Sequence, residues 1–154
     1  MQQQYIGNMV LGSAVDVTDP CADQDAACRL RVPILPGTYE AWCQYSEPSP
    51  WGSYVAALWL KKSDVAFCAL PPDGAWTSCG KIGVDSGIAG FFDRKPDLHG
   101  AAWEDLVDRT PDSGCVLDKL DGRDAFWCRT CGDGVYRVYA CGRRGVLLYL
   151  EDED

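Results

Sequence analysis

The sequence predicts a mainly β protein, α+β at most, built as an antiparallel β-sandwich or a partly open barrel with one short helix near residues 101–109. Short apolar runs of strand length recur along the chain between segments rich in Gly and Pro. Six Trp and seven Tyr supply bulky side chains that pack across neighbouring strands. One segment has the three-four spacing of a helix. Many short strands with a single helix favour this architecture.

Strands are expected where β-forming residues run between turn residues. In chain order the segments are 5–17 (two strands around a tight turn), 38–45, 54–60, 65–70, 81–85, 89–93, 125–130, 135–141 and 146–150. Segments 54–60 and 65–70 should pair as a hairpin. In 38–45, alternation should place Tyr39, Ala41 and Cys43 on one face and Trp42 on the other.

The helix is expected at Ala101–Arg109, where Ala102, Leu106 and Arg109 share one side. Thr110-Pro111 should end it, because the residue before a proline disfavours the helical conformation. Residues 22–29 form a loop or one helical turn, and further turns and loops are expected at 33–37, 46–53 and 71–80. Gly87 should hold a backbone conformation that Ala adopts poorly, because it interrupts two strand segments.

The composition indicates one globular domain over residues 1–154 with an acidic tail at 151–154. Hydrophobic residues make up 47% and charged residues 24%, which argues against disorder. The formal charge of −9 disfavours direct nucleic-acid binding and favours a protein partner. No apolar run approaches the roughly 20 residues that span a bilayer, and no secretion signal is visible. We therefore expect a cytoplasmic protein without membrane contact, and the oligomeric state stays open.

The chain contains nine cysteines, and without an export signal reduced thiols are the expected state. Cys43 and Cys68 lie in apolar segments and should be buried thiols. Cys128-Arg-Thr-Cys131-Gly132 has the shape of a zinc knuckle, or more weakly of a redox motif. A zinc site is thus a minor alternative to structural cysteines, and its ligands would be Cys115, Cys128, Cys131 and Cys141. No cofactor is expected.

Several acidic residues sit beside Gly, Pro or Ser at expected strand ends, and they could meet in one polar cluster. The candidates are Asp19, Asp85, Ser86, Asp93 and Asp133. Paired carboxylates could act as acid and base, and several could hold Ca²⁺ or Mg²⁺. The favoured interpretation is that each Asp fixes its own turn by accepting backbone N–H bonds. His99 is the only histidine and lies in an expected loop. A Ser86–His99–Asp93 triad lacks the elbow motif that would support it.

Four motifs taken together resemble DUF4241-type proteins, a bacterial family of unknown function with clostridial and phage-borne relatives. They are Val17–Cys21, Leu35–Tyr39, Gly83–Asp93 and Gly132–Tyr139. The resemblance spans most of the chain and implies a single β-rich domain without an assigned activity, cofactor or catalytic residue. Relatives tend to have a Ser-Gly pair where this chain has Cys128–Cys131, so a zinc role would be peculiar to this chain.

The function expected first is a non-enzymatic binding or interaction module of a bacterium or its phage. The acidic charge, the abundant aromatics and the lack of a catalytic set motivate it. One alternative is a small hydrolase or ligand-binding enzyme that uses the clustered Asp residues. Another is an acidic inhibitor that mimics nucleic acid, as an anti-defence protein would, with its carboxylates gathered on one face.

Overall fold

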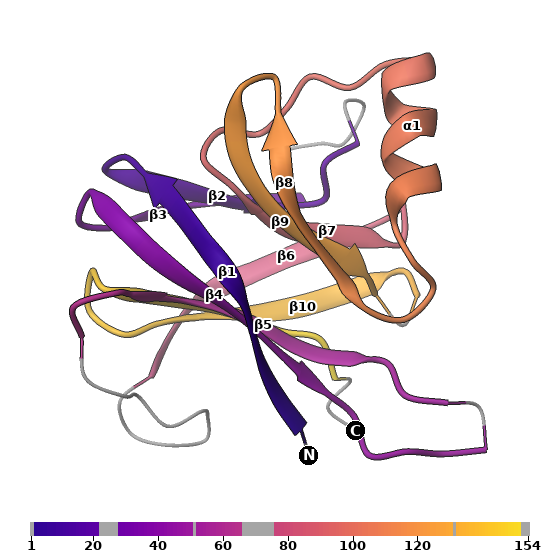
Figure 1. Ribbon diagram of the computed structural model, residues 1–154, viewed down its shortest axis with the longest axis horizontal. Coiled ribbons are helices and arrows are strands. Elements are labelled where there is room, and N and C mark those ends of the chain that lie inside the picture. Colours follow the sequence, from indigo (N-terminus) through magenta and orange to yellow (C-terminus); the bar gives the residue numbers. More distant parts are fainter. Residues whose placement is uncertain (1, 22–27, 51, 66–75, 131, 152–154) are drawn as a thin grey trace.

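The computed structural model describes residues 2–21, 28–50, 52–65, 76–130 and 132–151. This part of the chain forms eleven β-strands and one α-helix (Figure 1). In chain order they are β1 (Gln2–Leu11), β2 (Ala14–Thr18), β3 (Arg29–Pro33), β4 (Gly37–Tyr45), β5 (Val55–Lys62), β6 (Thr77–Val84), β7 (Ile88–Phe92), α1 (Ala101–Arg109), β8 (Cys115–Leu120), β9 (Arg123–Arg129), β10 (Gly134–Ala140) and β11 (Gly145–Tyr149).

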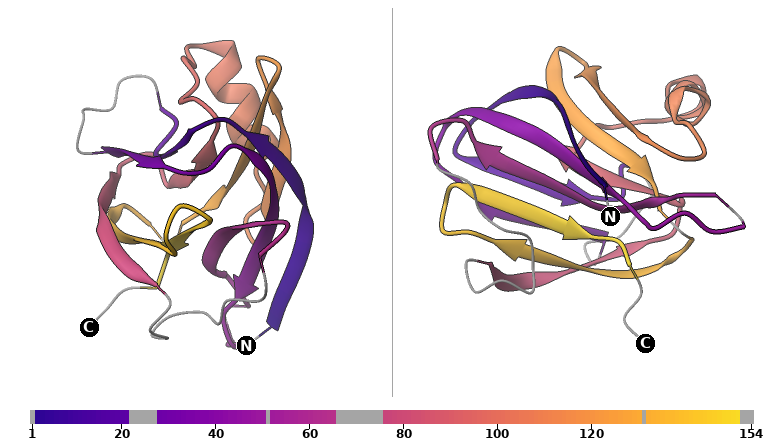
Figure 2. Two further views of the ribbon diagram at one scale, coloured as in Figure 1. Left: turned by 90° about the vertical axis from the view of Figure 1, so that its left-hand side faces the viewer. Right: turned by 60° about the horizontal axis from the view of Figure 1, so that its bottom comes forward.

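The strands form two sheets, and every pairing between named strands is antiparallel. The six-stranded sheet has the order β1-β4-β5-β11-β10-β6, and the five-stranded sheet has the order β3-β2-β7-β9-β8. The two sheets lie as separate layers (Figure 2) and do not close into a barrel. The expected mainly β class is confirmed, in its sandwich form.

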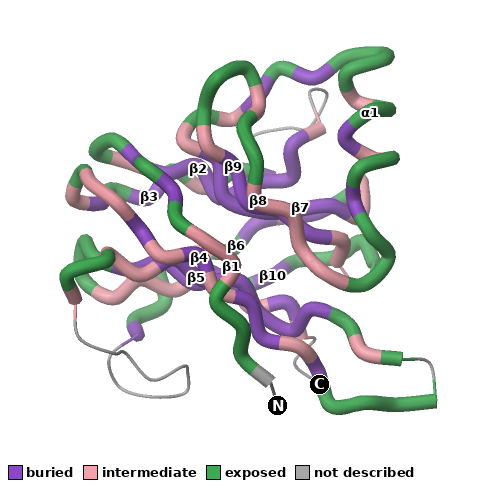
Figure 3. The backbone as a smooth tube through the Cα atoms, in the orientation of Figure 1, coloured by how far each residue is buried: buried purple, intermediate pink, exposed green. Residues whose placement is uncertain are grey.

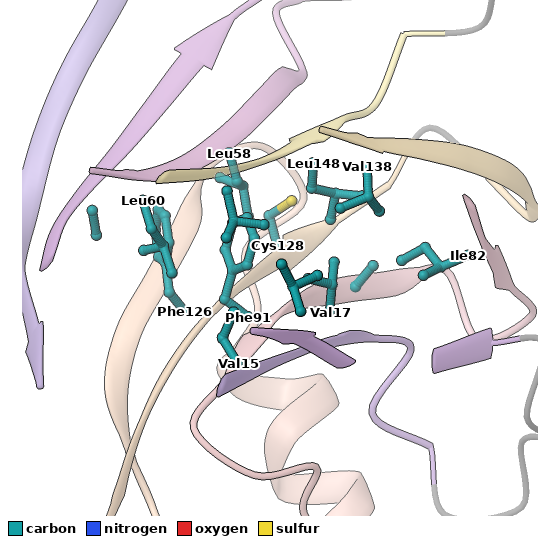
Figure 4. Packing of buried hydrophobic residues seen from close by; sticks show 14 of the residues in the cluster. Val15, Val17, Leu58, Leu60, Ile82, Phe91, Phe126, Cys128, Val138 and Leu148 are labelled. Atoms are coloured by element: carbon teal, nitrogen blue, oxygen red, sulfur yellow. The ribbon is translucent and has the colours of Figure 1, made fainter. Parts of the chain in front are cut away.

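The hydrophobic core lies between the two sheets because alternate residues of each strand point inward. Leu58 and Leu148 reach from the six-stranded sheet toward Phe91 and Phe126 of the five-stranded sheet (Figure 4). All four side chains are fully buried. Buried residues concentrate in the strands, while exposed residues occupy most turns and the outer side of the helix (Figure 3).

The helix α1 covers the outer face of the five-stranded sheet. Its residue Leu106 packs in a second cluster with Phe92 and Trp127. Trp127 Nε1 donates a hydrogen bond of 2.8 Å to Thr110 Oγ1, and the same hydroxyl donates to the Leu106 carbonyl at 2.6 Å. The helix ends at Arg109 as predicted, with Thr110 extended before its proline. No helix in the described residues is long and apolar enough to span a membrane.

Most strand predictions are confirmed within a few residues, as is the placement of Tyr39, Ala41 and Cys43 opposite Trp42. The two strands expected in 5–17 form, but they lie in different sheets. Two strands, β3 and β8, were not predicted, and residues 77–80, expected as loop, belong to β6. The expected strand 65–70 lies almost entirely outside the described residues, and β5 pairs with β4 and β11.

Candidate functional site

The two Asp/Gly segments singled out in the sequence meet at one end of the sandwich. Val84 pairs with Gly134 across β6 and β10, so Asp85 and Asp133 leave neighbouring strands at the same end. The Thr130 N–H donates to the Gly87 carbonyl at 2.9 Å and ties the segments together. Asp19, Asp85 and Ser86 are in direct contact, as the hydrogen bonds of the Asp19 carboxylate show.

Asp93 does not join this group. It follows β7, whereas Asp85 precedes it, and the strand Ile88–Phe92 separates the two by about 13 Å at the usual rise of a strand. The Asp93 carboxylate accepts a hydrogen bond of 3.2 Å from the Gly12 N–H instead. The structure therefore divides the predicted cluster between the two ends of β7, and Asp85 and Asp93 are farther apart than the acid pairs of glycosidases.

Asp19 is fully buried and its carboxylate accepts four hydrogen bonds. Oδ1 accepts from the Ser86 hydroxyl at 2.7 Å and from the Cys21 N–H at 3.0 Å. Oδ2 accepts from the N–H groups of Asp85 and Ser86, each at 2.9 Å. These bonds fix the turn in which Gly87 has φ 75°, the left-handed conformation expected there. The geometry matches a carboxylate that holds a turn.

Asp85 and Asp133 are exposed, and the Asp85 carboxylate lies 4.0 Å from Cys28 Sγ. The Ser86 hydroxyl donates to Asp19, and the exposed His99 pairs with Asp97 at 2.7 Å, so neither shows the hydrogen bond of a Ser-His pair. Among the described residues, no group of three or more Cys, His, Asp or Glu side chains is arranged to hold a metal ion.

The cysteines of the zinc alternative lie in different layers. Cys128 and Cys115 are opposite one another on β9 and β8 and belong to the core between the sheets. Cys141 packs on the outer side of the six-stranded sheet, beside Trp76. Cys131 lies outside the described residues. The described thiols of this set therefore do not surround one point.

A row of apolar side chains crosses the outer face of the six-stranded sheet, and the sequence analysis did not single it out. Cross-strand pairing aligns Tyr5 with Trp42, and Trp42 with Trp59. Leu147 and Tyr139 continue the row across β11 and β10. We call these five residues the aromatic row. The rings of Trp42 and Trp59 stack with centroids 6.0 Å apart, and the Tyr5 ring lies tilted 5.6 Å from Trp42.

Polar side chains border the aromatic row at its β1 end. Gln3 donates to Gln44 at 3.3 Å on one side, and on the other the Trp42 indole N–H donates to Glu40 at 3.0 Å. The Tyr5 hydroxyl donates to Asn8 at 2.7 Å. Exposure increases from β5 toward β1 along the row: Trp59 is 3% exposed and Tyr5 is 47% exposed. The row is thus packed at the sheet centre and open at the edge.

The open end of the row lies on β1, an edge strand of the six-stranded sheet. A bulge between Tyr5 and Gly7 shifts the alternation, so that Tyr5 points outward while Ile6 packs on the core. The predicted placement of Trp42 on the opposite face of its strand from Cys43 was the one signal for this face in the sequence. The bulge and the pairing of β1 with β4 involve residues far apart in sequence, and no local pattern revealed them.

No protein-family model matches this chain, and neither the curated proteins nor the solved structures give a match. The resemblance to DUF4241-type proteins therefore stays a prediction.

Proposed function

We propose that this chain is a non-enzymatic binding module of a bacterium or its phage, and that it binds a protein partner at the β1 end of the aromatic row. The observation that carries the proposal is the row itself, which ends at the edge strand in the exposed ring of Tyr5. Tyrosine and tryptophan beside polar side chains are typical of protein-binding surfaces, because their rings give contact area at a low cost in side-chain entropy.

The occupant that fits this place is an extended segment of the partner, added beside β1. An edge strand offers main-chain groups to an incoming strand, and neighbouring side-chain positions give specificity. Part of the edge is already occupied, because the N–H groups of Val10 and Gly12 donate to Asp124 and Asp93. We therefore place the contact on the first half of β1, where Tyr5 projects from the outer face.

The enzyme alternative receives less support from the geometry. The buried carboxylate of Asp19 is saturated with hydrogen bonds, and β7 separates Asp93 from Asp85. Asp85 and Asp133 are exposed at the same end of the sandwich, and the single histidine, His99, pairs with Asp97 instead.

One observation favours the nucleic-acid mimic as a second candidate. Exposed carboxylates gather on the side formed by α1 and the β8–β9 hairpin, at Glu104, Asp105, Asp108, Asp118 and Asp121. Arg109 reduces this charge, because it pairs with Asp105 and with Asp118. A mimic would bind the basic groove of its target through this side, and its binding would weaken steeply with salt.

The experiment compares wild-type protein with Tyr5→Ser and with the matched control Tyr54→Ser, a residue that is 41% exposed and lies in a loop outside the row. Each protein is immobilised, incubated with a native bacterial lysate, and any recovered protein is purified and titrated against all three. We expect binding to wild type and Tyr54→Ser and at least a tenfold weaker affinity for Tyr5→Ser, a loss of about 1.4 kcal/mol. Equal affinity for Tyr5→Ser would refute the site. Binding lost on charge reversal of Asp105 and Asp108 would favour the mimic.

A further inference from the structure

Three cysteines far apart in the sequence lie close to one another in the core between the sheets. Cys43 comes from β4 of the six-stranded sheet, and Cys115 and Cys128 come from β8 and β9 of the five-stranded sheet. All three are thiols. Cys43 and Cys128 are 0% exposed, while Cys115 is only partly buried. Figure 4 shows Cys128 in the layer between the two sheets.

The Cys115 thiol has a neighbour in each sheet. Cys128 is its cross-strand partner in the β8–β9 hairpin. Cys43 approaches it from the opposite sheet, where the hydroxyl of Tyr45, two residues after Cys43, would lie 3.9 Å from a Cβ atom on Gly114, the residue before Cys115. The sheets approach closely here, since a Cβ atom on Gly7 of β1 would lie 2.6 Å from Leu117 Cδ2 of β8. Gly7 is paired with Ala41, two residues before Cys43, and Leu117 lies two residues after Cys115.

We propose that Cys43 and Cys115 are a modification site at which a low-molecular-weight disulfide such as oxidised glutathione produces a covalent link between the two sheets. Cys115 is the point of entry because it alone of the three thiols is partly exposed. Cys43 completes the link from the opposite side. Disulfides between the two sheets of a β-sandwich are established in immunoglobulin domains, so the spacing of such layers permits the bond.

The reaction is a thiol–disulfide exchange in two steps. The Cys115 sulfur, having given up its proton, attacks one sulfur of the small disulfide, forms a mixed disulfide and releases one small thiolate. The Cys43 sulfur, after losing its own proton, attacks the Cys115 sulfur and releases the second small thiolate. Two cysteine thiols are oxidised to one disulfide, the small disulfide is reduced to two thiols, and the two protons go to the released thiolates.

In the reduced protein the hydrogen bond from Cys115 is the largest cause of the lowered pKa of Cys43, against the opposing influence of burial, and it is lost once Cys115 carries the small thiol. The Tyr45 hydroxyl assists Cys43 in the second step, because its hydrogen bond also lowers the pKa of Cys43. The hydrogen bond to Cys43 and burial raise the pKa of Cys115, so the first step is slow and needs an excess of the small disulfide.

The test treats the native protein with excess oxidised glutathione, alkylates the remaining thiols and digests with trypsin without reduction. Cleavage after Lys and Arg places the three cysteines in separate peptides, 32–61 with Cys43, 110–119 with Cys115 and 124–129 with Cys128. We expect peptides 32–61 and 110–119 to be joined by a disulfide, with a raised melting temperature of the oxidised protein. A glutathione adduct on the exposed Cys79 shows that the oxidant is active in the same sample.

Two variants separate the possible partners. Cys128→Ser should still form the link, whereas Cys43→Ser should stop at the mixed disulfide and retain glutathione on Cys115. Peptide 110–119 joined to 124–129 in the wild type would assign the bond to Cys128 and overturn the proposal. So would full alkylation of Cys43 and Cys115 in a sample where Cys79 carries glutathione. If Cys43→Ser does not fold, the wild-type peptides and Cys128→Ser still decide the question.

Discussion

Removing the Asp19 carboxylate should destabilise the protein more than removing any other acidic side chain of the candidate cluster. The side chain is 0% exposed and accepts four hydrogen bonds, at 2.7, 2.9, 2.9 and 3.0 Å. Hydrogen bonds to a charged group contribute about 1.5–3 kcal/mol each, but they are not additive when they share one acceptor. We expect Asp19→Ala to lower the free energy of unfolding by about 4 kcal/mol, because four donors lose their partner.

Urea unfolding followed by tryptophan fluorescence measures this effect. With a slope of about 2 kcal/mol per molar urea, the midpoint should fall by about 2 M at unchanged slope. Asp19→Asn keeps one acceptor oxygen and should cost about 2 kcal/mol. The matched control is Asp93→Ala, whose partly exposed carboxylate accepts a hydrogen bond from the Gly12 N–H, and it should lose less than about 1 kcal/mol. If Asp19→Ala unfolds within about 0.5 M urea of the wild type, the assignment of Asp19 as the anchor of this turn is wrong.

Three further predictions concern the backbone, acid stability and thiols. Gly87→Ala should cost about 1 kcal/mol from backbone strain at φ 75°, since no atom lies within 4 Å of the added Cβ. Gly12→Ala, whose φ is not positive, should unfold like the wild type in the same urea assay. Burial opposes the charge on Asp124, but hydrogen bonds from Lys119 and the Val10 N–H outweigh it and lower the pKa of the carboxyl. The ionised Asp124 therefore stabilises the folded protein at pH values above the pKa that this carboxyl has in the unfolded chain, and this stabilisation is lost as the pH falls through its lower pKa in the folded protein. In Asp124→Asn the urea midpoint should consequently decrease less between neutral and acidic pH than in the wild type. A thiol reagent should find few fast sites in the native protein and nine after denaturation without reductant; a lower final count would indicate disulfides.

The sequence predicted the elements whose information is local. The helix Ala101–Arg109 was correct to the residue, because apolar spacing defines it and a Thr-Pro pair ends it. The alternation in β4 correctly placed Cys43 and Trp42 on opposite faces of the strand. The strand β8 was missed although a local signal existed. Asp121-Gly122, with φ 51° and 76°, is the two-residue turn typical of a tight hairpin.

The candidate site was less accessible to prediction because it depends on which segments meet. Asp-Gly patterns correctly drew attention to the turn at Gly87, yet they gave equal weight to Asp93 at the other end of β7. The dominant partner of that turn, Asp19, comes from more than sixty residues earlier in the chain. The aromatic row likewise combines β1, β4 and β5 with the last two strands, and its register depends on a bulge in β1.

The positions of the carboxylates also bear on where a partner can bind. At one end of the sandwich Asp19 holds the Gly87 turn, and at the other Asp16 binds the Lys95 N–H at 2.7 Å and the Arg31 side chain at 2.9 Å. Both buried carboxylates hold loops in place through these hydrogen bonds, so replacing either residue would lower the stability of the fold. The outer face of the five-stranded sheet is covered by α1, which packs on Trp127. The aromatic row has no such helix among the described residues, and it opens at the β1 edge. A contact there uses side chains whose loss leaves the core and both ends intact, which is why Tyr5 is the residue at which binding and folding can be separated.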